Sequence, residues 1–300
     1  MAAITIKNMD VTYNKGKSYV IKDMNLEIKD GEFCVFLGPS GCGKSTAMYC
    51  IAGLLHPVHG EICFGNEAMN QLDERGKEKK FVPPQERNIA MVFQEYALYP
   101  NMTVRKNMSF ALETKKAPKE EIEKRVNSMS AMLGLDELLD RKPAQLSGGQ
   151  RQRVGIARAL IMNPKLIIAD ECISALDVSI QAQVVNLMKD IQEETQCAYL
   201  FIAHDLSMVK YISDRIGVLH LGYMVESGTK EEIFFHPVHP YTKSLLSAIP
   251  HPNPVVEKHR VALTYNYATS GIDYAKGTEH SVGGTHTVLA TDEEFDAWTK

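Results

Sequence analysis

Residues 38–46 read Gly-Pro-Ser-Gly-Cys-Gly-Lys-Ser-Thr, and they constrain the fold more than any other part of the chain. Glycines at the first, fourth and sixth positions let the backbone curl and turn its N–H groups inward, which suits a bound polyphosphate. The apolar run at 33–37 predicts a buried parallel strand, and a helix is expected from about Lys44 to Leu54. A phosphate-binding loop between a buried strand and a helix predicts an α/β domain.

The spacing of these glycines, the lysine and the serine is that of the P-loop, whose side chains suit a nucleotide with Mg²⁺. Lys44 can reach the β- and γ-phosphates, and the Ser45 hydroxyl can ligate the metal. The apolar run at 166–169 predicts another strand, which ends at two acids. There Asp170 can hold Mg²⁺ directly or through water, and Glu171 can act as the general base that polarises the attacking water. The sequence therefore predicts an enzyme that binds a nucleotide with Mg²⁺ and hydrolyses its phosphates.

The pattern along the chain predicts a P-loop NTPase fold with a mainly parallel sheet, an antiparallel β subdomain and an inserted helical subdomain. Strands are expected at 3–13, 19–28, 33–37, 89–93, 166–169 and 199–203, the first two joined by a turn around 14–16. In the helical subdomain, at about 100–163, apolar residues from Ile122 to Leu133 recur on one helix face. A later helix has Asp177 as its expected N-cap. From about Pro250, a sequence rich in Thr, Gly and Tyr predicts a poorly structured tail that is not rich in strands.

Composition and charge exclude several classes of protein. No apolar stretch approaches the roughly 20 residues of a membrane helix, and the start of the chain lacks a signal-peptide pattern, so a cytoplasmic protein is expected. The formal net charge of −4 gives no reason to expect nucleic acid as a partner. Six cysteines without a CxxC pair favour reduced, mostly buried thiols over disulfides, zinc or iron–sulfur ligation. Cys42 is the expected exception, because a thiol beside a helix N-terminus tends to have a lowered pKa.

A second Gly-rich segment, about a hundred residues after the P-loop, carries a family resemblance. It reads LSGGQRQRVGIARAL from Leu146 and resembles the signature of ATP-binding cassette (ABC) transporter ATPases. The resemblance covers roughly residues 3–235 and implies a head-to-tail dimer with two ATP molecules between the subunits. In such a dimer the signature of one subunit contacts the γ-phosphate of the nucleotide held by the other. Here the signature residues are Ser147, Gly148, Gly149 and Gln150.

The same resemblance assigns roles to residues elsewhere in the chain. Tyr13 matches the aromatic that stacks on adenine, and Gln94 matches the glutamine that senses Mg²⁺ and the permease. Asp177 lies in the loop that couples the two sites of the dimer, and His204 matches the switch histidine at the γ-phosphate. The expected catalytic residues are Glu171 and His204, and the expected Mg²⁺ ligands are Ser45, Gln94 and Asp170. The expected nucleotide-binding residues are Tyr13, Gly38, Pro39, Ser40, Gly41, Cys42, Gly43, Lys44, Ser45, Thr46 and Gln94.

The chain departs from the family pattern at one position of the site. Cys172 follows Glu171, where the family usually has proline. Because proline fixes φ and stiffens a loop, we expect somewhat slower hydrolysis than in a Cys172→Pro variant.

Two parts of the chain resemble the ATPases of different importers. Residues of about 30–145, including 83–94 and 96–100, resemble those of maltose-type sugar importers. Residues from about 150 onward, including 175–192 and the His-Pro-rich segment 236–243, resemble those of oligopeptide and dipeptide importers. The expected division is an ABC ATPase domain at 1–235 and an oligopeptide-importer-like C-terminal extension at 236–300. Peptide import is favoured, because too few residues follow 235 for the regulatory domain of sugar importers. A sugar importer, a natural recombinant and an engineered chimera stay open.

The resemblance also implies partners and a place in the cell. The partners would be ABC permease subunits, an extracytoplasmic substrate-binding protein, and either a second copy of this chain or a related ATPase. The chain would lie at the cytoplasmic face of the cell membrane, attached through the permease subunits. A soluble ABC ATPase of translation or DNA maintenance is a rival, but such proteins often carry two cassettes or a coiled-coil insertion, and this sequence shows neither. A non-catalytic scaffold that binds ATP is a third possibility, against which Glu171 and His204 argue.

Overall fold

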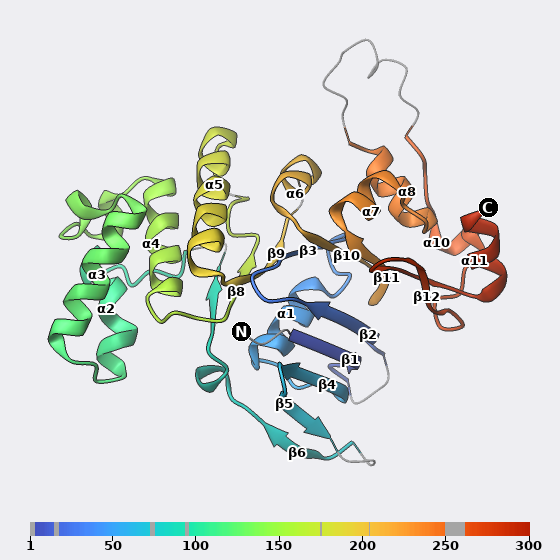
Figure 1. The fold of residues 1–300 in the computed structure, drawn as a ribbon, viewed down its shortest axis with the longest axis horizontal. Helices are drawn as coiled ribbons and strands as arrows, with labels where there is room; N and C mark the ends of the chain where they lie inside the picture. The colour runs from blue at the N-terminus through green and yellow to red at the C-terminus, as the bar shows by residue number, and fades with distance from the viewer. Residues whose placement is uncertain are drawn as a thin grey trace, which may run out of the picture.

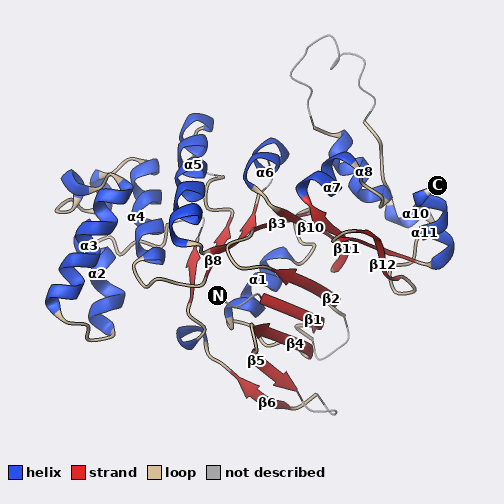
Figure 2. Ribbon diagram, in the orientation of Figure 1, coloured by secondary structure: helices blue, strands red, loops and turns tan. Residues whose placement is uncertain are grey.

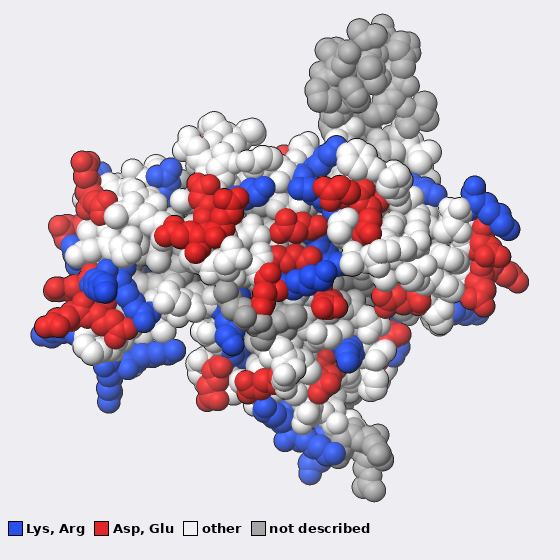
Figure 3. Space-filling view, in the orientation of Figure 1, with Lys and Arg blue, Asp and Glu red and all other residues white. Residues whose placement is uncertain are grey.

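The computed structural model describes residues 4–14, 18–72, 76–93, 96–174, 176–203, 205–249 and 262–300. It contains two sheets, with most helices on one side of the larger sheet and the smaller sheet on the other (Figures 1 and 2). Among the described residues, no helix combines the length and the apolar character that crossing a membrane requires. Acidic and basic side chains lie interspersed over the face shown in Figure 3.

The larger, central sheet has the strand order β12-β13-β11-β10-β3-β9-β8-β7, and its strands β10, β3, β9, β8 and β7 run parallel. These five strands are β3 (Phe33–Leu37), β7 (Ile89–Val92), β8 (Leu166–Asp170), β9 (Ala198–Ile202) and β10 (Arg215–His220). In β3 every side chain is buried, because Phe33 and Val35 pack in one hydrophobic cluster and Cys34 and Phe36 in another. A continuous apolar run is what a parallel strand covered on both faces requires.

The smaller sheet has the strand order β2-β1-β4-β5-β6, and each pair of neighbouring strands in it runs antiparallel. Its strands are β1 (Ile4–Val11), β2 (Ile21–Ile28), β4 (His59–Phe64), β5 (Glu67–Leu72) and β6 (Glu78–Phe81). The prediction of two antiparallel strands at the start of the chain is confirmed, and the expected turn falls partly outside the described residues. Helix α1 (Lys44–Ala52) packs with this sheet against one face of the central sheet.

Three helices between β7 and β8 form the predicted inserted subdomain. They are α2 (Val104–Thr114), α3 (Lys119–Leu133) and α4 (Gly148–Leu160), with short 3-10 turns at Asp136–Leu138 and Pro143–Gln145; a further turn, Pro84–Glu86, precedes β7. The predicted apolar face of α3 is confirmed, because Val126 and Leu133 are buried and Ile122 and Met129 pack half-buried against the same hydrophobic cluster. The longer helix α5 (Val178–Thr195) and α6 (Leu206–Ile212) cover the central sheet.

The C-terminal part of the chain is more ordered than its sequence predicts. It contains β11 (Tyr223–Thr229), α7 (Lys230–Phe235), α8 (Pro240–Ser247), α10 (Tyr267–Ser270), β12 (Thr278–Gly283), β13 (His286–Ala290) and α11 (Asp292–Thr299). The prediction of a poorly structured tail poor in strands is wrong for residues 262–300, and residues 250–261 lie outside the described part. The hairpin of β12 and β13 is ordered because β13 pairs with β11 and buries His286, Val288 and Ala290 on alternate positions.

Candidate functional site

The loop at 38–46 lies between β3 and α1, as its sequence predicts, and two of its glycines allow close contact with neighbouring backbone. Gly38 has φ +149°, and a Cβ there would lie 2.2 Å from the carbonyl oxygen of Leu219. Gly43 has φ +106°, and a Cβ there would lie 2.9 Å from the carbonyl oxygen of Val20. Any side chain at either position would push the loop away from this support. The loop is therefore held tightly between β10 and the segment before β2.

Lys44 supplies a nearly buried positive charge at the loop. Its side chain is 6% exposed, and Nζ donates to the carbonyl oxygens of Gly38 and Pro39, each at 2.8 Å. Within the described part of the chain, no carboxylate forms an ion pair with it. A buried cation without a counter-ion, next to a curled backbone, fits the phosphates of a nucleotide.

Ser45 and Asp170 lie together although 125 residues separate them in sequence. The Ser45 hydroxyl donates to Oδ1 of Asp170 at 3.4 Å, and the Tyr49 hydroxyl donates to Oδ2 at 3.3 Å. Burial raises the pKa of Asp170, and the nearby Glu171 adds to this, whereas the hydrogen bonds from Tyr49 and Ser45 oppose it. A hydroxyl and a carboxylate are the hard oxygen ligands that Mg²⁺ takes, so the residues fit that ion.

Tyr49 is a site residue that the sequence reasoning missed. It lies one helical turn after Ser45, so both side chains reach the same carboxylate from one face of α1. In the sequence, only the spacing of four residues from Ser45 could have indicated this role of Tyr49. Burial and the neighbouring Asp170 raise the pKa of the Tyr49 hydroxyl, which therefore stays a donor.

Glu171 follows β8 in an unusual backbone conformation. Its φ is +48°, which is uncommon for a residue with a side chain, and its carbonyl oxygen accepts from the backbone N–H of Ser174 at 3.1 Å and from the Ser174 hydroxyl at 2.9 Å. Strained backbone of this kind concentrates at functional sites. Cys172 is 2% exposed, and burial raises the pKa of its thiol to about 12, so it packs as a neutral side chain.

The expectation of an acidic thiol at Cys42 is wrong. The side chain is 3% exposed, and its burial raises the pKa of the thiol more than the neighbouring Lys44 lowers it. A position beside a helix N-terminus does not expose a thiol when the loop folds its side chain inward.

The remaining predicted nucleotide contacts lie at the loop or outside the described residues. Tyr13 is 64% exposed, and its hydroxyl lies 3.1 Å from Oγ1 of Thr46 at the start of α1. The exposed ring therefore lies beside the phosphate loop. Gln94 and His204 are among the residues that the structure does not describe. In the sequence each is the second residue after a parallel strand, since β7 ends at Val92 and β9 at Ile202.

The signature segment forms the N-terminus of α4, where Ser147 is exposed and Gly148, Gly149 and Gln150 are half-buried. Ser147 caps this helix: its Oγ accepts from the N–H of Gln150 at 3.3 Å, and its own N–H donates to Oε1 of Gln150 at 2.9 Å. A Cβ on Gly149 would lie 2.7 Å from the side chain of Ile180, so the glycine lets α4 approach α5 closely. Asp177 occupies the N-cap of α5, as predicted, but its side chain makes no capping hydrogen bond.

Within the described part of the chain, no hydrogen bond links residues 147–150 to the phosphate loop. The exposed N-terminus of α4 offers backbone N–H groups and the positive end of a helix dipole to a ligand that comes from outside the chain.

Two family profiles match the chain. That of the ABC transporter family matches residues 21–174, and that of the oligopeptide/dipeptide transporter C-terminal region matches residues 225–269.

Relatives with similar sequences are ATP-binding proteins of transport systems. The oligopeptide transport ATP-binding protein OppF of Streptococcus mutans is 45% identical over 305 residues, which cover 99% of this chain and 97% of that protein. The dipeptide transport ATP-binding protein DppF of Lactococcus lactis is 44% identical, over 99% of this chain and 96% of that protein. OppF of Bacillus subtilis is 46% identical, over 95% of this chain and 94% of that protein.

Solved structures with a similar fold are ABC proteins. The structure of cbiO1 from Clostridium perfringens, described as part of the ABC transporter complex cbiONQ, superposes with a TM-score of 0.70 at 30% identity and covers 78% of this chain and 90% of that chain. The ATP-binding cassette MJ0796, solved as a dimer bound to ADP and Pi, superposes with a TM-score of 0.64 at 34% identity. The match covers 76% of this chain and 98% of that chain.

Proposed function

This chain belongs to the ABC transporter family, and we propose that it is the ATP-hydrolysing subunit of an importer of oligopeptides or dipeptides. The observation that carries this choice is the similarity to peptide-transport ATP-binding proteins over 95–99% of the chain. That similarity includes residues of about 30–145, which by themselves resemble sugar-importer ATPases. The match of the C-terminal region at 225–269 supports the same substrate class.

The P-loop and its neighbours would bind the nucleotide. Bound ATP with Mg²⁺ supplies a phosphoanhydride bond and a metal that stabilises the charge developing on its phosphates. Backbone N–H groups of residues 40–46 and the ammonium of Lys44 would hold the phosphates, and the ring of Tyr13 would stack on the base. Ser45 and Asp170 supply oxygens for Mg²⁺, together with Gln94, and Tyr49 keeps the Asp170 carboxylate in place.

Glu171 would carry out the proton transfer of the reaction. Placed directly after Asp170, its carboxylate accepts a proton from the attacking water, and His204 steadies the γ-phosphate as charge builds on it. The Ser174 hydrogen bonds to the Glu171 carbonyl hold the backbone that aims this carboxylate.

Two chains are needed to complete each site. The exposed N-terminus of α4, with Ser147, Gly148, Gly149 and Gln150, would contact the γ-phosphate held by a second copy or by a related ATPase, and Asp177 would couple the two sites. ATP binding then closes the dimer and hydrolysis releases it, because the closed state binds ATP more tightly than the open state. The closure would move permease subunits at the cytoplasmic face of the membrane, and a substrate-binding protein would deliver peptide from outside.

We divide the chain for this purpose into an ATPase domain at 1–235 and a C-terminal extension at 236–300. The matched C-terminal profile begins earlier, at residue 225, and thus includes most of β11 of the central sheet.

Affinity purification of the chain from its native membrane, with identification of the bound permeases, tests the proposal. Peptide-type permeases support it, and peptide uptake should cease when Lys44 is replaced by alanine. Co-purification with sugar-type permeases alone would overturn the peptide assignment. The number of different ATPases recovered distinguishes a homodimer from a heterodimer.

A further inference from the structure

Residues 219–222 (the 219–222 turn), which comprise the last two residues of β10 and the two residues before β11, contact the phosphate loop. The N–H of Gly222 donates to the carbonyl oxygen of Cys42 at 3.1 Å, and the carbonyl of Leu219 lies directly against Gly38. Gly222 also accepts, through its carbonyl oxygen, from the N–H of Lys22 at 2.9 Å. Because these contacts are between backbone atoms, a shift of the turn moves the loop with it.

His220, the last residue of β10, is held by tyrosines from the C-terminal extension. Its ring stacks on Tyr241, with 4.2 Å between centroids and 24° between planes, and its Nδ1 lies 2.7 Å from the hydroxyl of Tyr274. Tyr265 contacts the ring edge-on at 5.7 Å, and its hydroxyl lies 3.1 Å from that of Tyr274. Burial lowers the pKa of His220.

Glu226 fastens the extension to the central sheet. This carboxylate on β11 is buried and accepts from the N–H of Val238 at 2.7 Å and from the N–H of His239 at 3.0 Å. Its Oε1 also lies 2.7 Å from Nε2 of His286 on β13, in a pair whose side chains are 0% and 3% exposed. One side chain thus joins the start of α8 and the C-terminal hairpin to β11.

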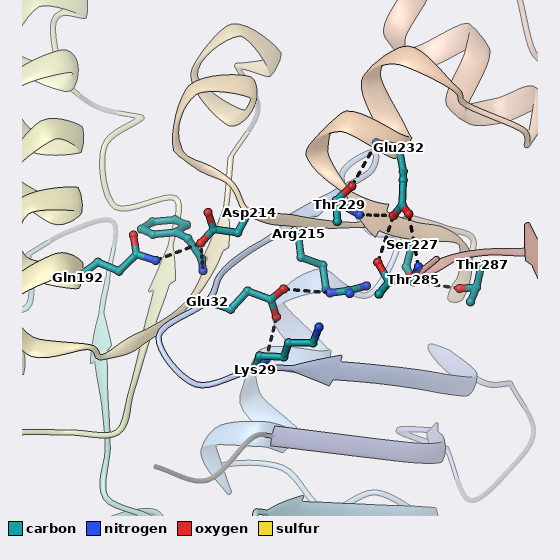
Figure 4. A network of polar contacts seen from close by, with 11 residues as sticks. Lys29, Glu32, Gln192, Asp214, Arg215, Ser227, Thr229, Glu232, Thr285 and Thr287 are labelled. Carbon is teal, nitrogen blue, oxygen red and sulfur yellow. Dashed lines mark hydrogen bonds and ion pairs between the residues drawn. The ribbon is translucent and has the colours of Figure 1, made fainter. Parts of the chain in front are cut away.

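A second carboxylate repeats this connection, as Figure 4 shows. Glu232 accepts from the N–H of Thr229 at 2.7 Å and from the hydroxyl of Thr285 at 3.1 Å. Burial alone would raise its pKa, but these hydrogen bonds hold the pKa of Glu232 below its usual value. Nearby, the hydroxyls of Ser227 and Thr287 lie 3.0 Å apart across β11 and β13. The extension is therefore anchored to the sheet at several points and can act as a rigid support.

We propose that His220 is a positioning residue for ATP binding and hydrolysis. The tyrosines of the extension fix its ring, and the 219–222 turn passes this constraint to the phosphate loop. This inference rests on the ATP-binding part of the proposed function and does not depend on the transported substrate.

Coupling between two sites is reciprocal, so a nucleotide bound at the phosphate loop should change the environment of residues in the extension. Trp298, the only tryptophan of the chain, can report this. Its ring meets that of His239 edge-on at 5.0 Å, and His239 in turn contacts Tyr274 at 5.7 Å. Tryptophan fluorescence should therefore change when the full-length chain is titrated with ATP and Mg²⁺.

The decisive variant is Tyr274→Phe, which removes one oxygen and keeps the ring. The matched control is Tyr199→Phe, since the Tyr199 hydroxyl is buried and makes no hydrogen bond. We expect Tyr274→Phe to weaken ATP binding about five-fold or more, as typical coupling energies imply, and to reduce the fluorescence response. His220→Ala should have a larger effect, and His220→Gln, which can still bond to Tyr274, should recover part of it. Tyr199→Phe should bind ATP like the native chain.

Thermal melting identifies any variant that fails to fold. If the His220 variants fail to fold, the ATP affinity of Tyr274→Phe tests the inference, because this variant is the smallest change. If folded Tyr274→Phe keeps the native ATP Kd and KM, or if Tyr199→Phe loses as much, His220 has only a structural role and the inference is wrong. If the native chain itself does not bind ATP, the proposed function fails instead.

Discussion

Nη1 of Arg87 donates to the carbonyl oxygen of Ile51 at 2.8 Å and so closes the C-terminal end of the helix whose N-terminal end carries the phosphate loop. The same nitrogen donates to the carbonyl of Cys50 at 2.9 Å, and Nε donates to the carbonyl of Val82 at 2.7 Å. Arg87 is 2% exposed, and its burial lowers the pKa of the guanidinium to about 10. A Cβ on Gly53 would lie 2.5 Å from Nε, so the glycine makes room for this arginine.

Replacing Arg87 by methionine should destabilise the protein strongly. The change leaves several buried carbonyls without a donor, which costs on the order of 3 kcal/mol in the free energy of unfolding. Arg105→Met, at an exposed position of α2, serves as the control and should change stability by less than about 0.5 kcal/mol. Denaturant unfolding of both variants measures the difference, and equal stabilities would contradict this role of Arg87.

Glu171→Gln should trap an ATP-bound dimer. Without the carboxylate that accepts the proton, hydrolysis should fall by about 10²–10⁴-fold while nucleotide binding persists. Light scattering at saturating ATP should then give the mass of two chains. Adding Ser147→Arg, which fills the exposed N-terminus of α4, should restore the monomer, and a monomeric Glu171→Gln chain would refute the shared-site arrangement.

Cys172→Pro should hydrolyse ATP faster than the native chain, by less than about ten-fold, or 1.4 kcal/mol in the barrier. Proline would stiffen the turn that holds Glu171 at its positive φ. Cys172→Ala, which shortens the side chain without stiffening the backbone, is the control and should not gain activity. Steady-state phosphate release compares the three, and equal or slower hydrolysis by the proline variant would count against the prediction.

Thiol reagents should modify Cys63 before any other cysteine of the native protein. It is the only one of the six that is not buried. Labelling followed by peptide mass analysis should show a first phase that disappears in Cys63→Ser and that ATP does not slow. A first phase that disappears in Cys42→Ala would mean that the phosphate loop exposes its thiol in solution.

Stability should fall in mild acid partly because of His239. Burial lowers the pKa of this imidazole to about 3, whereas the unfolded chain protonates it near pH 6.5. The unfolded state therefore binds the extra proton between these values, so the contribution is complete above pH 6.5 and is lost as the pH falls toward 3. Between pH 7 and pH 5 this amounts to about 2 kcal/mol.

The His239→Asn variant isolates that contribution, because asparagine can still accept from the N–H of Tyr241 at the start of α8. The free energy of unfolding should depend less on pH in the variant than in the native chain. Identical pH profiles would show that His239 is not the titrating group.

The sequence predicted the parts of the site that lie close together along the chain. The loop at 38–46, the strand before it and the helix after it follow from local spacing, and the acids after β8 follow from an apolar run. The roles of Tyr49 and Arg87 were not predicted, because each depends on a partner far away in the sequence. These partners are Asp170 for Tyr49 and the carbonyl of Ile51 for Arg87. Cys42 was assigned wrongly for the same reason, since burial by distant segments outweighs a local helix effect.

The C-terminal hairpin shows the same limit in the fold. Its strands are short and lie among Thr and Gly residues, so the alternation from His286 to Ala290 is too brief to stand out. What orders it is pairing with β11 and the buried contact of His286 with Glu226, neither of which a local pattern encodes.

The pairing of β13 with β11 also decides where this protein can be cut. A chain shortened at residue 235 would retain all of the predicted nucleotide-binding motifs but would leave the outer side of β11 without a neighbour. Unpaired strand edges recruit other chains, so such a fragment would tend to aggregate. A fragment that keeps β11 paired must therefore extend to the C-terminal hairpin, because the ATPase domain and the segment that follows it share one sheet.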